Sequence, residues 1–470
     1  MKSSKPPTDV RPEVSENDAA QGSAANRSNI VIASAAGAKL DSHLLKGGGT
    51  DDTLVLQDVL DRGRSGLHTH LIIDGVALVR GLDVYSNTTI ECIAGGGLYL
   101  ADGANRAVIR NANRSADARL EQRIVIRSCF LNGNGRNQPG VGVEQGSPTS
   151  GQEADGTWIA GMQFFGVSEL TLENVSLWGT RRFGIHIANA TNISITGVNV
   201  DHGHASDATT IATSGTDGLH FNGNVHFVRI NGARFRTGDN ALALNANDSP
   251  LGPFVRNGPI SDVVATDILV DNAESAIRIL SGTERIDNVI INNISGSING
   301  TRAVSISHWL SKDHGNIGSI VIGNLNIRRA PETAPLGDEM YALMRSDEEK
   351  YKYHLPEFNY GEYPLININA MIENITFSNI VVGASDDKPI FAIGPDADLE
   401  LLSLDLSFFD PSLKAVPLRI EKGASVKQLN FLLNWNGSLP PHALNPIENR
   451  GGTIGQLNWI GPSPDFQKSE

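Results

Sequence analysis

The chain has 470 residues, 52 of them acidic and 38 basic, and a formal net charge of −14 at pH 7. This balance repels polyphosphate and anionic lipid surfaces, so it argues against nucleic acid and membranes as partners. The length exceeds one compact core, which requires two domains or an architecture that grows by repetition. With 49 glycines and only 6% aromatic residues, the composition favours an all-β protein of short strands and tight turns with little helix.

The two cysteines, Cys92 and Cys129, are too few for a disulfide framework or a cysteine zinc site, and we expect both to be core thiols. The sequence shows no long apolar run, and hence neither a membrane span nor a signal peptide. A processed exported protein, a recombinant form, a phage component and an intracellular protein all stay open. A secreted or periplasmic location is favoured among them.

Residues 1–28 are rich in Ser, Pro, Asn, Asp and Ala without periodicity, which predicts a flexible leader ahead of a fold formed by residues 29–470. The segment GGGTDDTLVLQDVLDRG begins with Thr and Asp and then places apolar residues at helical spacing, namely Leu54, Val55, Val59 and Leu60. We therefore expect one short amphipathic helix that caps the open N-terminal end of the fold.

From there onward the sequence repeats a template with apolar residues at positions 1, 3, 6 and 8 and small polar residues at positions 4 and 5. Copies start at Ile124, Leu170, Ile193, Val228, Val263, Ile320 and Ile375, with a partial copy at Val289. A second short strand follows most copies, as in FGIHIAN, DGLHFNG, NALALNA, SAIRILS and RAVSISH. The pattern predicts stacked coils with at least two strands each, whose buried apolar rows stabilise the stack collectively.

If these second strands stack in register, their outward residues form columns on one face of the sheet. One column then contains Phe183, Asp217, Asn240, Ser275 and Arg302, and another contains His186, His220, Ala243, Arg278 and Ser305. Asp239 stands at the strand entrance next to Asn240. The register therefore predicts an exposed strip that carries Asp217, Asp239, Asn240, His220, Asn222 and Arg278.

Two carboxylates on neighbouring coils, Asp217 and Asp239, supply what cleavage of a glycosidic bond needs. One would be protonated for the leaving oxygen and the other ionised to activate water. Mutual repulsion would help to separate their pKa values. The competing interpretation is that TDG and GDN are ordinary turn sequences.

The segment GTDGLHF, followed 22 residues later by TGDNALAL, resembles the motifs of the family-28 glycoside hydrolases, the polygalacturonase-like enzymes. GTDDTLVLQDVLD and FLNGNGRNQ are similar to the family's N-terminal cap and early coils, and the resemblance covers roughly residues 50–330. It implies a single-stranded right-handed parallel β-helix of the pectin-lyase-like type. It also implies an inverting hydrolase in which Asp239 is the general acid and Asp217 holds the attacking water, with Arg278 similar to the family's substrate clamp.

The sequence departs from the family pattern at three places. Asn240 replaces a carboxylate, Leu280 replaces the clamp's Lys, and no Gly-His-Gly coil lies between residues 240 and 275. Loss of the Lys favours a neutral or differently decorated sugar over galacturonate. Because Asn240 can orient a water but cannot accept its proton, Asp217 would be the sole base unless Asp248 folds back to help.

We expect the substrate, a polysaccharide or its oligosaccharides, to be contacted by His220, Asn222, Asn245, Arg278, Asp248 and His186. A solvated surface histidine is the alternative for His220. His202 and His204 have a spacing seen in metal ligands, but the sequence offers no clear third ligand, so we expect no metal and no cofactor.

Residues 331–363 interrupt the coil rhythm and hold five of the seven tyrosines of the chain. This insertion is predicted to be a lid over the sugar or an oligomer contact. A monomer and a homo-oligomer, a trimer included, both stay open.

Two alternatives to the hydrolase remain on the same fold. A polysaccharide lyase is supported by Arg278 alone. A non-catalytic carbohydrate-binding β-helix, such as a phage tailspike or a surface adhesin, is suggested by Asn240 and the missing His.

Overall fold

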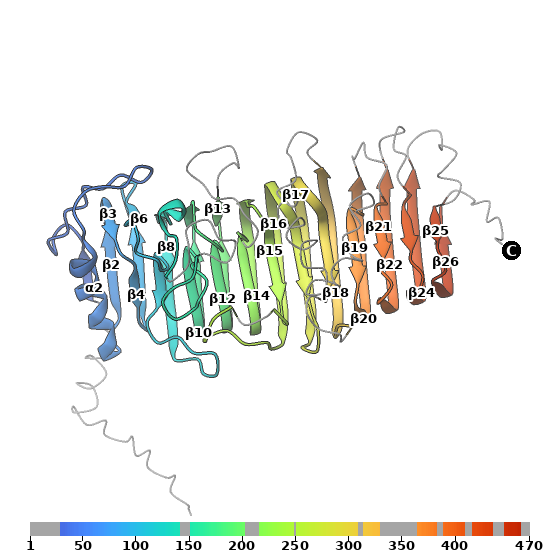
Figure 1. Cartoon of the computed structure of the whole chain (residues 1–470), viewed down its shortest axis with the longest axis horizontal. Coiled ribbons are helices and arrows are strands. Elements are labelled where there is room, and N and C mark those ends of the chain that lie inside the picture. The colour runs from blue at the N-terminus through green and yellow to red at the C-terminus, as the bar shows by residue number, and fades with distance from the viewer. Residues whose placement is uncertain are drawn as a thin grey trace, which may run out of the picture.

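The computed structural model describes residues 29–141, 151–202, 216–248, 251–308, 314–329, 364–382, 389–408, 416–435 and 446–461. Within these residues 26 strands form one sheet, and its strand pairs run parallel. The strands wind in stacked coils from the blue N-terminal end to the red C-terminal end (Figure 1). The fold is a right-handed parallel β-helix, as predicted.

The strands follow one another in short steps along the chain. They are β1 (Asn29–Ile32), β2 (Thr69–Ile73), β3 (Val76–Val79), β4 (Leu82–Val84), β5 (Thr88–Cys92), β6 (Gly97–Leu100), β7 (Ile109–Asn111), β8 (Glu121–Arg127), β9 (Phe130–Asn132), β10 (Met162–Glu173), β11 (Ser176–Trp178), β12 (Ile185–Thr196), β13 (Asn199–Asp201), β14 (Leu219–Arg236), β15 (Asn240–Asn245), β16 (Ile260–Leu280), β17 (Ile286–Ser307), β18 (Ile317–Arg329), β19 (Ile366–Asn369), β20 (Met371–Val382), β21 (Phe391–Ile393), β22 (Asp398–Phe408), β23 (Leu418–Ile420), β24 (Ser425–Trp435), β25 (Ile447–Asn449) and β26 (Thr453–Ile460).

The template predicted from the sequence forms the buried rows of the stack. Its first position pairs from coil to coil through Ile124, Leu170, Ile193, Val228, Val263, Val289, Ile320 and Ile375. All eight side chains are buried in one core that runs along the helix. Each buried Val, Ile or Leu contributes roughly 1.5–3 kcal/mol, and each needs the neighbouring coil to cover it.

The small residue at position 5 of the template bends the chain sharply, either between two strands of a coil or within one long strand. In seven copies this residue is Asn174, Gly197, Gly232, Asp267, Asn293, Asn324 or Asn379, with φ between 50° and 68°. Left-handed backbone conformations strongly favour Gly, Asn and Asp. The turn therefore explains why the template carries these residue types at this position.

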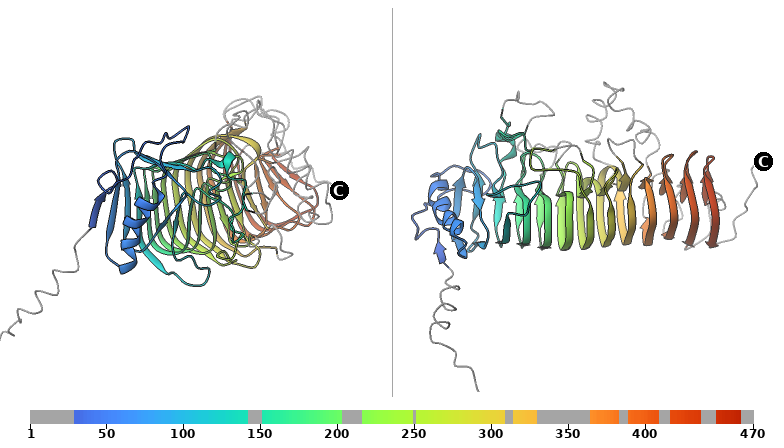
Figure 2. Two further views of the ribbon diagram at one scale, coloured as in Figure 1. Left: turned by 60° about the vertical axis from the view of Figure 1, so that its left-hand side comes forward. Right: turned by 90° about the horizontal axis from the view of Figure 1, so that it is seen from below.

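Helix α2 (Thr53–Asp61) lies at the N-terminal end of the stack, as predicted (Figures 1 and 2). The side-chain amide of Gln57 anchors it to β4, donating to the carbonyl of Asp83 at 3.0 Å and accepting from its backbone N–H at 2.9 Å. The predicted apolar face is partly wrong, because Leu54 is 85% exposed and Leu56 is buried instead. The other described helices are two 3-10 turns, η1 (Arg62–Ser65) and η2 (Gly135–Asn137).

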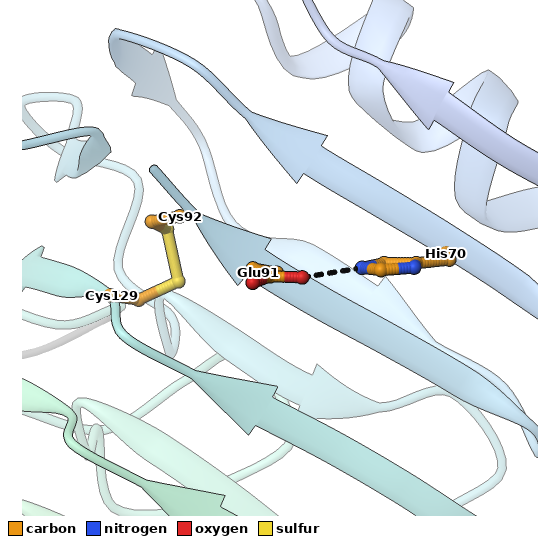
Figure 3. The surroundings of a disulfide bond; sticks show 4 residues. All are labelled: His70, Glu91, Cys92 and Cys129. Carbon is orange, nitrogen blue, oxygen red and sulfur yellow. Dashed lines mark hydrogen bonds and ion pairs between the residues drawn. A yellow bond between two sulfur atoms is a disulfide. The ribbon is translucent and has the colours of Figure 1, made fainter. Parts of the chain in front are cut away.

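Cys92 and Cys129 form a disulfide, so the expectation of free core thiols is wrong (Figure 3). Cys92 ends β5, and Cys129 follows β8, which pairs with β5 so that Ile90 lies beside Ile126. Stacked strands are about 4.8 Å apart, which falls within the Cα separations that a disulfide spans. The observed Cα–Cα distance is 4.8 Å. The two cysteines lie on adjacent coils, so the normal spacing of the coils brings them close enough to form the disulfide.

The predicted leader at residues 1–28 and the Tyr-rich insertion at residues 331–363 lie outside the described residues. None of the helices in the described part of the chain is long and apolar enough to cross a membrane.

Candidate functional site

The second strands of successive coils stack with the predicted register. In one column, from β12 to β17, each residue pairs with the next: His186 with His220, His220 with Ala243, Ala243 with Arg278, and Arg278 with Ser305. In the other column, Asn240 pairs with Ser275 and Ser275 with Arg302. The pairing confirms the column of His186 and, in the other column, the order of Asn240, Ser275 and Arg302.

The predicted exposure of this strip is wrong. Asp217 and His220 are each 2% exposed, Asn222 is 1% exposed and His186 is fully buried. Phe165 and Phe183, whose rings contact His186 and His220, belong to a second apolar cluster. Its members are Ala160, Phe165, Phe183, Ala188, Leu251 and Val255, with Trp158 and Phe254 packed against it. The segments before β10 and after β15 thus fold over this face of the β-helix.

Asn240 joins the two carboxylates that the sequence singled out. Its side-chain Nδ2 donates to Oδ1 of Asp217 at 3.0 Å and to Oδ1 of Asp239 at 2.7 Å. Its backbone N–H also points at both oxygens, at 3.0 Å each. An amide can donate to two acids at once, whereas a carboxylate at this position would add a third negative charge. Asp239 is half-buried, so it is the more accessible of the two acids.

His220 lies between two carboxylates. Its Nδ1 contacts Oδ2 of Asp217 at 2.5 Å, and its Nε2 lies 3.5 Å from Oδ2 of Asp248. Burial alone lowers the pKa of His220, but the hydrogen bond to Asp217 and the nearby carboxylate of Asp248 outweigh burial and raise the pKa to about 9. The imidazole is therefore charged at neutral pH, and the ring of Phe183 stacks on it with centroids 4.0 Å apart.

Asp248 folds back toward the site, but it reaches His220 rather than Asn240. Asn245 Nδ2 donates to its Oδ2 at 2.9 Å. Burial raises the pKa of Asp248, yet the contact with charged His220 outweighs burial and holds this pKa below its usual value. Asp248 thus neutralises a buried imidazolium together with Asp217.

His186 and Asn222 form a support behind His220. Nε2 of His186 donates to Oδ1 of Asn222 at 2.6 Å, an assignment that fixes the tautomer. Burial holds the pKa of His186 well below its usual value, so the ring is neutral. Its edge meets the rings of Phe165 and His220, with centroids 4.7 Å and 5.0 Å away. Neither side chain is accessible to a sugar in this structure.

A third carboxylate, Glu274, was missed by the sequence reasoning. It precedes Ser275 as Asp239 precedes Asn240, and its backbone N–H donates to the carbonyl of Asp239 at 3.2 Å. Burial and the charge of Asp239 raise the pKa of Glu274 to about 8, although Arg278 acts in the opposite direction. The predicted columns could have identified Glu274, because it directly precedes SAIRIL and therefore stacks on Asp239, which directly precedes NALALN.

Two arginines add positive charge around the acids. Arg278 is half-buried on the coil directly after Asn240, which confirms that no further coil intervenes. Arg182 is 3% exposed and lies over the ring of Trp158, 4.8 Å from the centroid. Burial lowers the pKa of Arg182 to about 10, and the charge of Asp239 acts against this.

His202, considered above as a metal ligand, holds the backbone of the site instead. Its Nδ1 lies 2.9 Å from Oγ1 of Thr180, and its Nε2 lies 3.2 Å from the carbonyl oxygen of Asp217. His204 lies outside the described residues.

No family model matches the sequence, and no curated protein matches it. Among solved structures, a family 28 exopolygalacturonase of Yersinia enterocolitica is similar, with 15% identity over 92% of this chain and 78% of that chain and a TM-score of 0.58. An exopolygalacturonase of Thermotoga maritima has 16% identity over 87% of this chain and 92% of that one, with a TM-score of 0.50. A surface adhesin of Streptococcus pneumoniae has 13% identity over 94% and 96% of the two chains, also with a TM-score of 0.50. At these identities the likeness shows the shared fold, a right-handed parallel β-helix found in enzymes and in an adhesin.

Proposed function

We propose that this protein acts on a polysaccharide or its oligosaccharides as an inverting glycoside hydrolase. Asp239 would donate a proton to the leaving oxygen, and Asp217 would accept one from the attacking water. The observation that carries this proposal is the bridge through Asn240, whose Nδ2 lies within 3.0 Å of a carboxylate oxygen from each acid. The motifs GTDGLHF and TGDNALAL, which resemble those of family 28, support the same roles.

Asp239 is suited to the acid role because Glu274 lies beside it on the next coil. Two neighbouring carboxyl groups do not readily ionise together, so such a pair retains one proton to a higher pH than a single carboxyl group. The raised pKa of Glu274, about 8, expresses this retention. The pair as a whole therefore holds one proton at neutral pH, bound to Glu274, and Asp239 would have to take up this proton before it acts as the acid.

Asp217 is suited to act on water rather than to attack the sugar directly. It is 2% exposed, and its oxygens accept from Asn240 and contact His220. A nucleophilic carboxylate must touch the anomeric carbon, whereas a base needs to reach only a water molecule. We expect substrate binding to displace Phe183 and Trp158, because the ring of Phe183 stacks on His220 and the ring of Trp158 stacks on Phe183.

The replacement of the clamp's Lys by Leu280 favours a neutral sugar. Asp217, Asp239 and Glu274 gather three carboxyl groups, and Leu280 is a buried apolar residue where the family pattern has a Lys. A uronate carboxylate would therefore lack the cation that the family pattern places at this position. A neutral or differently decorated glycan fits better.

The test is the release of reducing ends from a panel of neutral and acidic glycans by wild type, Asp239→Asn and Asp217→Asn. Both substitutions should lower release by roughly 10³-fold or more, because each removes a proton-transfer group. Asp267→Asn is the matched control, since Asp267 is exposed in a turn where Asn is equally compatible with a φ of 58°. Release accompanied by ultraviolet absorbance of a new double bond would show a lyase instead.

A second candidate is a non-catalytic glycan-binding β-helix, favoured by the burial of Asp217 between Asn240 and His220. In that case these residues would be structural. The protein would bind a glycan from the panel without releasing products, and Asp217→Asn would lower its stability and leave its affinity for the glycan unchanged.

A further inference from the structure

Three potential metal ligands converge at turns beyond the candidate glycan site. His308 directly follows β17, His314 precedes β18, and Asp396 lies in the turn between β21 and β22. One donor atom from each residue lies within 4.8 Å of the other two. No other such group of three or more His, Cys, Asp or Glu side chains occurs in the described part of the chain.

The distances within this group suit a shared cation. Nε2 of His308 lies 3.4 Å from Oδ2 of Asp396, and Nδ1 of His314 lies 3.7 Å from Oδ1. Charge-assisted hydrogen bonds are shorter, at about 2.7–2.9 Å. Ligand atoms around a tetrahedral zinc ion, each about 2.0–2.2 Å from it, lie roughly 3.3–3.5 Å from one another.

The two histidine rings also have a suitable arrangement. Their centroids are 6.0 Å apart and their planes are tilted by 83°. The rings therefore do not stack, and both approach the same carboxylate. Two imidazoles and a carboxylate form a ligand set that zinc sites use with a fourth position left for water.

A buried amide holds the carboxylate in place. Asn369, 2% exposed at the end of β19, donates from Nδ2 to Oδ2 of Asp396 at 3.3 Å, and its Oδ1 accepts from the backbone N–H of Asp396 at 2.9 Å. Such outer contacts commonly orient the first ligands of a metal ion. His308 is 5% exposed, whereas the side chains of His314 and Asp396 are 52% and 39% exposed. The site thus has a rigid inner side and an outer side open to water.

We propose that His308, His314 and Asp396 bind one zinc ion that links the coil of β17 to the coil of β21, across the coil of β19 between them. His308 and His314 come from the connection between β17 and β18, and Asp396 comes from the turn between β21 and β22, 88 residues after His308 in sequence. A metal that binds only the folded arrangement stabilises that arrangement. The net charge of −14 further favours a cation.

The experiment is calorimetric titration of zinc chloride into the full chain after treatment with a chelator, together with thermal unfolding. Wild type should bind one zinc ion per chain and unfold at a higher temperature with zinc than without. Asn369→Ala should weaken binding by about 10–100-fold. His314→Ala and Asp396→Asn should weaken it at least as much. His43→Ala, which removes an exposed histidine elsewhere, should bind as wild type does.

Two results would overturn the site: the absence of stoichiometric zinc binding, or equal binding by wild type, His314→Ala and Asp396→Asn. His314 is half-exposed, so its substitution tests the site without disturbing the core. The proposal does not depend on catalysis, because none of its ligands belongs to the group around Asp217 and Asp239.

Discussion

At the scale of single residues, the candidate site depends on Asn240. Its amide donates to Asp217 and Asp239 at once, so two acids share one neutral donor. The sequence predicted that these three residues meet, because the register of the second strands places them on neighbouring coils. It did not predict that His220 would be a buried cation. The charge depends on Asp248, which lies in a turn outside the repeating apolar pattern, so the pattern could not place Asp248 next to His220.

Asn240→Asp tests the bridge. The substitution replaces a donor with an acceptor beside two carboxylates, so we expect a loss of about 1–3 kcal/mol of unfolding free energy at neutral pH. The loss should shrink at acid pH, where the new carboxyl group takes up a proton. Urea unfolding at about pH 5 and about pH 8 measures both effects. An equal loss at the two pH values would contradict the account.

Glu274→Gln tests the acid pair through linkage. The folded protein raises the pKa of Glu274 from 4.5 to about 8, so the folded state binds its proton more tightly than the unfolded state does. The stability from this group is fully present below pH 4.5 and is lost as the pH rises through about 8.

Gln mimics the protonated form, so the variant should gain stability relative to wild type as the pH rises across this window. Urea unfolding of both proteins across the window measures the difference. A relative loss with rising pH would contradict the raised pKa.

At the scale of elements, the template predicted the coils because each apolar residue of one coil packs against an apolar residue at the same template position in the next coil. The helix was located correctly, but Leu54 was expected on its buried face and Leu56 lies there instead. Either leucine fits the helical spacing of the apolar residues, and only the packing of the helix against β2 and β4 decides between them. The disulfide was missed because a separation of 37 residues in sequence does not show that the two cysteines are close in space. Their proximity follows only from the pairing of β5 with β8.

The left-handed turn makes a distinct prediction at Asn324, whose φ is 50°. Its side chain accepts from Asn379 Nδ2 at 2.6 Å and donates to Oδ1 of Asn292 at 2.8 Å. Asn324→Ala should cost about 1–2 kcal/mol of unfolding free energy from backbone strain alone. Asn324→Gly, which tolerates the turn, should cost less. If Gly proved as destabilising as Ala in urea unfolding, the strain argument would fail.

The disulfide should stabilise the first coils by restricting the unfolded chain. For a sequence separation of 37 residues, chain entropy gives about 4 kcal/mol, and measured bridges contribute about 2–4 kcal/mol. Cys129→Ser should lower the unfolding free energy by that amount, and reductant should affect wild type similarly. Denatured, unreduced protein should show no free thiol, whereas two titratable thiols per chain would refute the bridge.

At the scale of the whole molecule, the β-helix was predictable because every coil repeats the same burial pattern. The covered state of the strip was not, because the covering residues around Trp158 and Phe254 come from turns outside the template. Function does not follow from the fold either, since this fold serves enzymes and adhesins alike. The hydrolase proposal therefore rests on the side chains around Asn240.

The stereochemistry of the released sugar tests the central claim most directly. One nitrogen donates to an oxygen of each acid, at 3.0 Å and 2.7 Å, so these two oxygens lie closer together than the roughly 6.5–9.5 Å usual between the acids of inverting enzymes and nearer to the roughly 5–5.5 Å of retaining enzymes. The decisive measurement is proton NMR of the first products from an active glycan of the panel. Our account predicts an inverted anomeric configuration, lost in Asp239→Asn and Asp217→Asn and kept in Asp267→Asn. A retained configuration, or release that survives Asp239→Asn, would contradict it.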